Sequence, residues 1–143
     1  MTVTLSETPE SIFIGAHHVQ FIPPGLIRVE WNGSCSRDDF ARVLEWADGH
    51  VIRKPYVLLA NLARLENVTP EARQFSATDP RFALIKRIGF IGASFHQRVV
   101  ATMISRAVEL YYKDRKGQLQ FFDSEVQALD WLHLEYARIH PSL

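Results

Sequence analysis

The sequence is poor in cysteine, has no excess of either charge and contains no long apolar run, and each shortage excludes a class of protein. Cys35 is the single cysteine of 143 residues, which excludes an internal disulfide and indicates a reducing compartment. Sixteen basic residues balance sixteen acidic ones, whereas proteins that coat nucleic acid or anionic membranes normally carry a basic excess. No apolar stretch approaches the ~20 residues of a membrane span, and the start of the chain lacks the pattern of a signal peptide. We therefore expect a bacterial-type cytoplasmic protein with no nucleic-acid partner and no membrane insertion.

Signatures of the common enzyme classes are also missing. No pair among the six histidines has the spacing of a metal site, so we expect no bound metal. The patterns GxSxG, GxxxxGK[ST] and GxGxxG are absent, which removes the commonest hydrolase and nucleotide-binding fingerprints. Cys35 precedes an expected helix, but no histidine and Asn or Asp accompany it in a recognisable arrangement. The sequence predicts neither an enzyme nor a cofactor.

Apolar residues are present in sufficient number for one folded unit. Hydrophobic residues make up 47% of the chain and charged residues 22%, as in ordinary globular proteins. A length of 143 residues fits a single domain, and no linker or repeat interrupts it. We expect residues 1–16 to be a loose N-terminal lead and residues 17–143 to form the domain.

Five segments have the patterns of strands. Ile27, Val29 and Trp31 alternate with polar residues, which predicts a half-buried strand, and the turn at Pro23–Gly25 pairs it with the segment before it. The continuous apolar run at Tyr56–Ala60 is typical of a strand buried on both faces. The five predicted strands are residues 19–22, 26–31, 56–60, 88–92 and 119–122.

Helix starts are marked by capping residues between these strands. Ser36 and Ser124 are predicted N-caps, and Thr69 followed by Pro70 has the same signature. A fourth, longer helix follows the strand at 88–92. The alternation of elements predicts an α/β fold, with a mixed, mainly parallel sheet of about five strands, an N-terminal antiparallel hairpin and about four covering helices.

The turn before the longest predicted helix is a candidate anion or ligand site. It joins the end of a strand to a helix N-terminus, where free N–H groups and the helix dipole favour a negative charge. Arg98 lies one turn further on and is suited to a bidentate contact. Alternatively, Ser94 and Gln97 form a capping box and the turn has a structural role alone. The candidate residues are Gly92, Ala93, Ser94, Phe95, His96 and Arg98.

Three stretches, together with the order of elements, resemble the STAS family of sulfate-transporter and anti-sigma-factor-antagonist domains. They are Leu26–Gly33, Tyr56–Ala72 and Phe121–Leu132, and the likeness is to stand-alone bacterial members described as sporulation stage II AA-like. Signalling members carry an Asp-Ser-Ser/Thr-Gly motif whose serine is phosphorylated to switch partner binding. The matching stretch here, Asn61–Pro70, has neither that aspartate, nor the serine, nor the glycine, and Thr69 is its one hydroxyl. The resemblance therefore implies the fold without the usual phosphorylation switch.

Two functions are consistent with these observations. The first is a non-enzymatic regulatory or protein-interaction domain, because the resemblance implies a protein partner and no catalytic motif is present. The alternative is a binder of a small anionic or lipid-like ligand, since some members of the family resemble lipid-transfer domains or bind anions. A homodimer is compatible with either function. The candidate partner surface consists of Glu66, Asn67, Thr69 and Arg73.

Overall fold

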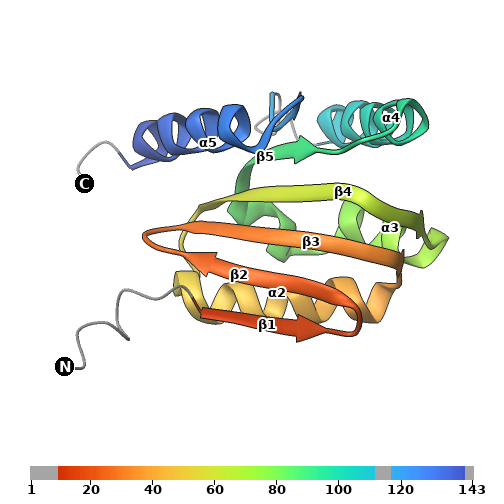
Figure 1. The fold of residues 1–143 in the computed structure, drawn as a ribbon, viewed down its shortest axis with the longest axis horizontal. Coiled ribbons are helices and arrows are strands. Elements are labelled where there is room, and N and C mark those ends of the chain that lie inside the picture. Colours follow the sequence, from red (N-terminus) through yellow and green to blue (C-terminus); the bar gives the residue numbers. More distant parts are fainter. Residues whose placement is uncertain (1–9, 112–116, 141–143) are drawn as a thin grey trace.

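Six strands form one mixed sheet in the computed structural model, which describes residues 10–111 and 117–140 (Figure 1). Their order across the sheet is the same as their order along the chain. The first three strands pair antiparallel, and each later strand pairs parallel to the one before it. The strands are β1 (Glu10–Ile14), β2 (His17–Ile22), β3 (Leu26–Cys35), β4 (Tyr56–Val68), β5 (Ile85–Ile91) and β6 (Leu119–Phe122).

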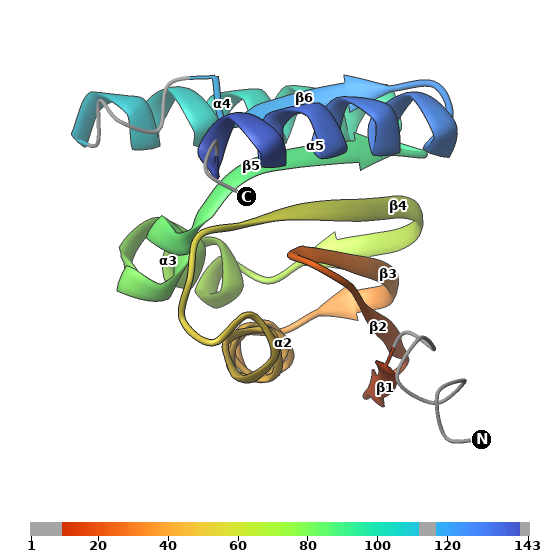
Figure 2. The same cartoon turned by 90° about the vertical axis from the view of Figure 1, so that its left-hand side faces the viewer.

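Helices cover both faces of this sheet. Helix α5 packs on one face, and α2 lies with α3 on the opposite face (Figure 2). Their bounds are α2 (Arg37–Val51), α3 (Pro70–Thr78), α4 (Phe95–Tyr111) and α5 (Glu125–Ile139), with a short 3-10 helix at Pro80–Leu84. The α/β class, the antiparallel N-terminal hairpin and the four α-helices predicted from the sequence are thus confirmed.

Strand β4 lies between two hydrophobic clusters. Leu58 points into the larger cluster with Val29 and Leu44, beneath α2 and α3. Its neighbour Leu59 points the other way and packs with Leu132 beneath α5. Successive side chains of a strand point to opposite faces of the sheet. A continuous apolar run therefore places apolar side chains in the core on each face. The prediction that residues 56–60 form a strand buried on both faces is confirmed.

Three predicted helix caps are present. The hydroxyl groups of Ser36, Thr69 and Ser124 each accept a hydrogen bond from the backbone N–H three residues later, at 3.1 to 3.2 Å. Each bond satisfies one of the N–H groups that a helix start leaves without a partner. Polar hydroxyl residues therefore fix where α2, α3 and α5 begin.

Two elements differ from the sequence prediction. Residues 10–14 of the expected loose lead form β1, while residues 1–9 lie outside the described residues. Strand β1 is at the sheet edge and buries Ile14 alone, so it has no alternating apolar pattern to reveal it. Strand β4 continues from Ala60 to Val68 because its second half, although largely exposed and polar, still pairs with β3. The sheet consequently has six strands rather than five.

Two histidine–carboxylate pairs fasten the N-terminal strands to α2. The ring of His17 is buried; its Nδ1 accepts from the backbone N–H of Asn32 at 3.0 Å, so Nε2 carries the proton and donates to Asp39 at 3.2 Å. At the other end of α2, His50 Nε2 lies 2.6 Å from the Glu10 carboxylate. The edge strand β1 is thereby attached to the helix behind it.

The second of these pairs makes the attachment of β1 dependent on pH. Burial lowers the pKa of the His50 imidazole, but bonds to the Trp46 carbonyl and to Glu10 outweigh it and raise the pKa above its ordinary 6.5. A raised pKa means that the stabilisation is complete below about pH 6.5 and is lost as the pH rises through the higher value. The variant Glu10→Gln should therefore unfold more easily than the wild type near about pH 5.5 and equally near about pH 9.

Thermal unfolding across this pH range checks the prediction. Glu125→Gln is the matched control, because Glu125 pairs with Arg28 at 2.7 Å and a guanidinium stays charged throughout. The control should show a pH-independent difference from the wild type. The same pH dependence in both variants would contradict the role of His50.

Candidate functional site

An apolar cavity of about 240 Å³ lies between the sheet and the layer formed by α2, α3 and α4. Its volume exceeds the ~150 Å³ of a cavity that holds benzene and is just below the ~300–1,000 Å³ of drug-sized sites. Side chains from all the surrounding elements form its walls, and most of them are aliphatic or aromatic. They include Trp31, Phe40, Leu44, Leu58, Ala60, Leu62, Phe82, Ile88, Phe90, Val100 and Leu119.

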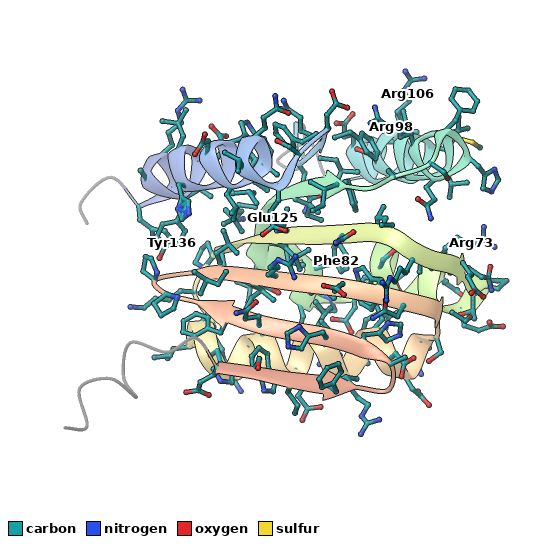
Figure 3. All side chains as sticks on the ribbon, in the orientation of Figure 1. Arg73, Phe82, Arg98, Arg106, Glu125 and Tyr136 are labelled. Atoms are coloured by element: carbon teal, nitrogen blue, oxygen red, sulfur yellow. The ribbon has the colours of Figure 1, made fainter. Side chains whose placement is uncertain are left out.

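Polar side chains gather at one end of this cavity, which we call the rim. They come from the end of β4, from α3 and from the first turn of α4. Figure 3 shows Arg73 at this end of the molecule. The rim lies at the carboxyl ends of parallel strands, where α/β sheets bind their ligands. Its residues are Glu66, Asn67, Arg73, Ser76, His96 and Gln97.

Gln97 ties α4 to the end of β4. Its side-chain Nε2 donates to the backbone carbonyls of Leu65 at 2.9 Å and of Leu62 at 3.4 Å. Its Oε1 accepts from the Ser94 N–H at 2.8 Å, while the Gln97 N–H donates to the Ser94 hydroxyl at 3.1 Å. These two reciprocal bonds are the capping box predicted as the structural role of the turn. One glutamine thus fixes both the start of α4 and its position over the cavity.

The candidate ligand residues of the turn divide between two sides of α4. His96 faces the rim, close to the predicted partner residues Glu66, Asn67 and Arg73. Arg98 points elsewhere: its guanidinium lies over the Phe121 ring, 5.3 Å from the centroid, and 3.7 Å from the Asp123 carboxylate. Anion binding at the turn stays a prediction.

Gly92 holds the backbone of this turn in a conformation that other residues rarely adopt. Its φ is +70°, and a Cβ placed on it would lie 2.8 Å from the backbone nitrogen of Ala63 in β4. The chain therefore passes close against β4 as it leaves β5. The positive φ and the close packing against β4 together account for a glycine at position 92.

Thr69 is the N-cap residue of α3. Its hydroxyl accepts from the Ala72 N–H at 3.1 Å, and its own N–H donates to the Cys35 carbonyl at 3.1 Å. Thr69→Ala should lower the free energy of unfolding by about 0.5–2 kcal/mol, while Thr69→Asp, which still caps, should stay near the wild type. Denaturant titration measures both. Stoichiometric phosphorylation of Thr69 in protein from its native host would contradict a role limited to capping.

The cavity wall contains the single cysteine. Burial, together with the nearby Asp39 carboxylate, raises the pKa of the Cys35 thiol to about 12. Since the thiolate is the nucleophile, this thiol is poorly suited to covalent chemistry near neutral pH. Among the described residues no group of three or more His, Cys, Asp or Glu is placed to hold a metal ion. Within residues 10–111 and 117–140, no helix is both long and apolar enough for a transmembrane span.

Sequence reasoning missed the cavity itself. The sequence pattern predicts that the residues of the cavity wall are ordinary core residues. Periodicity shows which side chains face inward, but it does not show whether they fill the space between the sheet and the helices. Ser76 and the tie from Gln97 to β4 were also missed, since nothing in the sequence places α3 and α4 next to the end of that strand. The capping-box pattern of Ser94 and Gln97 is the one signal that the sequence offers, and it does not indicate the bonds from Gln97 to β4.

The architecture is a STAS-like fold, as comparison with solved structures shows. One similar structure is a protein of the DUF3478 family from Shewanella loihica with a SpoIIAA-like fold; the TM-score is 0.53 at 16% identity, over 87% of this chain and 92% of that one. Another is the anti-sigma factor antagonist SpoIIAA in its unphosphorylated form, with a TM-score of 0.55 at 12% identity, over 82% and 98% of the two chains. No protein-family model matches the sequence, and no curated protein matches it. The resemblance noted in the sequence is therefore confirmed at the level of the fold.

Proposed function

We propose that this chain is a non-enzymatic regulatory domain of a bacterial cytoplasm that binds a small apolar molecule with an anionic end. The observation that carries the proposal is the cavity, an apolar space within a sheet-and-helix sandwich and bordered by polar side chains at one end. Well-packed interiors leave few voids larger than a water molecule. A space of this size, lined mainly by apolar side chains, is suited to a hydrocarbon or aromatic group.

The rim indicates which polar end such a molecule has. Arg73 offers a guanidinium, and His96 with Asn67 offers further hydrogen-bonding groups. Glu66 borders the same rim and disfavours an anion close to its own side. A carboxylate directed at Arg73, with its apolar part in the cavity, satisfies this arrangement, and a medium-chain fatty acid is the simplest molecule of this class.

A second candidate function is binding of a protein partner at the rim. It is supported by the likeness to SpoIIAA, an anti-sigma factor antagonist, and by the exposed second half of β4 next to α3. The partner residues would be Glu66, Asn67, Thr69 and Arg73. The two functions are compatible, because a molecule under the rim alters the surface that a partner contacts.

Calorimetry with octanoate and decanoate, preceded by native mass spectrometry of gently purified protein, tests the proposal. We expect binding that Ala60→Leu, which fills the cavity, weakens at least tenfold. Arg73→Ala should weaken it too, whereas the matched variant Arg98→Ala should not. Loss of binding in Arg98→Ala alone would place the ligand at the Gly92–Arg98 turn instead. If neither carboxylate binds and no molecule co-purifies, the ligand proposal is wrong and the protein-partner function is favoured.

A further inference from the structure

Helix α4 carries a row of exposed apolar side chains that the cavity does not use. Phe95 is 82% exposed, Val99 40%, Met103 65% and Leu110 80%. With ~3.6 residues per turn, positions i, i+4, i+8 and i+15 fall on one side of the helix. Single exposed apolar residues are common on proteins, but several along one side of a helix, interrupted here by Arg106, mark a contact surface. We call these four residues the α4 stripe.

The α4 stripe is independent of the candidate ligand site. The cavity is lined by other residues of the same helix, among them Val100 and Ala101. Figure 3 shows Arg106, which is eleven residues after Phe95 and therefore on the side of the stripe, projecting from α4 away from the sheet. The stripe and the cavity therefore lie on different sides of α4, and a contact made by the stripe does not depend on the proposed function.

Opposite charges flank the stripe near its two ends. Arg98 and Glu109 are eleven residues apart, which is about three helical turns, so both lie on the same flank. In the monomer Arg98 approaches the exposed Asp123 carboxylate at 3.7 Å, and Glu109 accepts a long bond of 3.4 Å from the Gly117 N–H. Neither contact buries the charged group. One flank thus has a cation near the helix start and an anion near its end.

This arrangement is complementary to itself in one orientation. We propose that α4 docks against α4 of a second copy of the chain, antiparallel, about a two-fold axis close to Met103. Residues on one flank of an antiparallel pair face the same flank of the other helix, so Arg98 of each copy meets Glu109 of the other. A parallel two-fold pair would place the two copies of this flank on opposite sides of the interface, so Arg98 of one copy could not meet Glu109 of the other. The symmetry forms two such ion pairs and lays Phe95 against Leu110 of the other copy.

The expected association is reversible. Two helices of 17 residues meet along at most about 25 Å, which puts the contact at the low end of specific interfaces, near ~1,200 Å² in total. A dimer of this size dissociates on dilution. Its core would be the aromatic and thioether side chains of the α4 stripe, residue types enriched at protein interfaces.

Sedimentation velocity over a range of concentrations tests the proposal. The wild type should dimerise, and Met103→Lys should weaken dimerisation at least tenfold. Leu134→Lys is the matched control, because Leu134 is a 53% exposed leucine on α5 and should leave dimerisation unchanged. Circular dichroism confirms that each variant is folded. A wild type that stays monomeric overturns the proposal, and so does a dimer that Met103→Lys leaves intact. If the wild type is monomeric, the α4 stripe is instead a contact surface for a different protein.

Charge exchange and cross-linking test the orientation. Arg98→Glu and Glu109→Arg should each weaken the dimer, and the double variant should restore it. Under oxidation, a mixture of Phe95→Cys and Leu110→Cys proteins should form a disulfide-linked heterodimer, whereas Phe95→Cys alone should not cross-link. Cys35 is buried and does not compete. Failure of the double variant to restore association, or efficient cross-linking of Phe95→Cys alone, overturns the antiparallel pairing.

Discussion

Replacing Leu132 by alanine should lower the free energy of unfolding by about 2–5 kcal/mol, as truncation of a large buried side chain does. Leu132 is fully buried and belongs to the hydrophobic cluster between α5 and the sheet. Its Cδ1 is so close to β5 that a Cβ on Gly89 would lie 3.3 Å away. The space left by the missing atoms is bounded by paired strands, which restricts collapse around it. Denaturant titration followed by tryptophan fluorescence measures the loss.

The control for this prediction is two residues further along the same helix. Leu134 is 53% exposed, and Leu134→Ala should change stability by less than about 0.5 kcal/mol. Both variants make the same chemical change in the same helix, so their difference isolates burial. Equal losses would show that α5 is packed on a different face from the one described.

A similarly large loss is expected for Gly92→Ala. A left-handed backbone costs a residue with a Cβ about 1–2 kcal/mol, and Gly92 has φ +70°. The added Cβ would also lie 2.8 Å from the backbone nitrogen of Ala63, a contact that no side-chain movement relieves. Crowding of this kind typically costs a further ~1–3 kcal/mol. The two costs add because they have separate causes.

Gly33 is the matched control for Gly92. Its φ is +74°, and a Cβ there would meet no atom within 4 Å. Gly33→Ala should therefore show the backbone cost of about 1–2 kcal/mol alone. Equal stability of the two variants would show that the turn at Gly92 does not lie close to β4. If Gly92→Ala keeps its stability but loses a bound anion, the turn is a ligand site after all.

Much of the fold was predictable because its signals are local. A capping hydroxyl, a proline at a first helical turn and a run of apolar residues act within a few positions, so Thr69–Pro70 and Tyr56–Ala60 could be interpreted without knowing their neighbours. The element order then fixed the α/β class. Resemblance of three stretches to the STAS family agreed with it, and the structural likeness bears it out.

Features that depend on packing between distant segments could not be predicted. Helical periodicity places Met103 on the inner side of its helix, yet it is exposed, because the stripe of α4 turns away from the sheet. The strand pattern predicts that Phe90 is buried, but it is half-buried and stacks on Phe121 at 5.1 Å. The cavity beneath α4 depends on how three helices sit on one sheet. Periodicity along one segment contains no information on that fit.

The sheet has one further property, which concerns how the protein is made. Because the spatial order of its strands follows the chain, each strand that leaves the ribosome finds its neighbour already in place. Consecutive strands are separated by a turn or by one or two helices, so the entropy lost in forming the sheet is divided into small steps. The face beneath α5 is the exception, since its cover is synthesised last. A nascent chain shorter than Glu125 therefore exposes Leu59 and its neighbours, and this surface is the one that a chaperone would meet during synthesis.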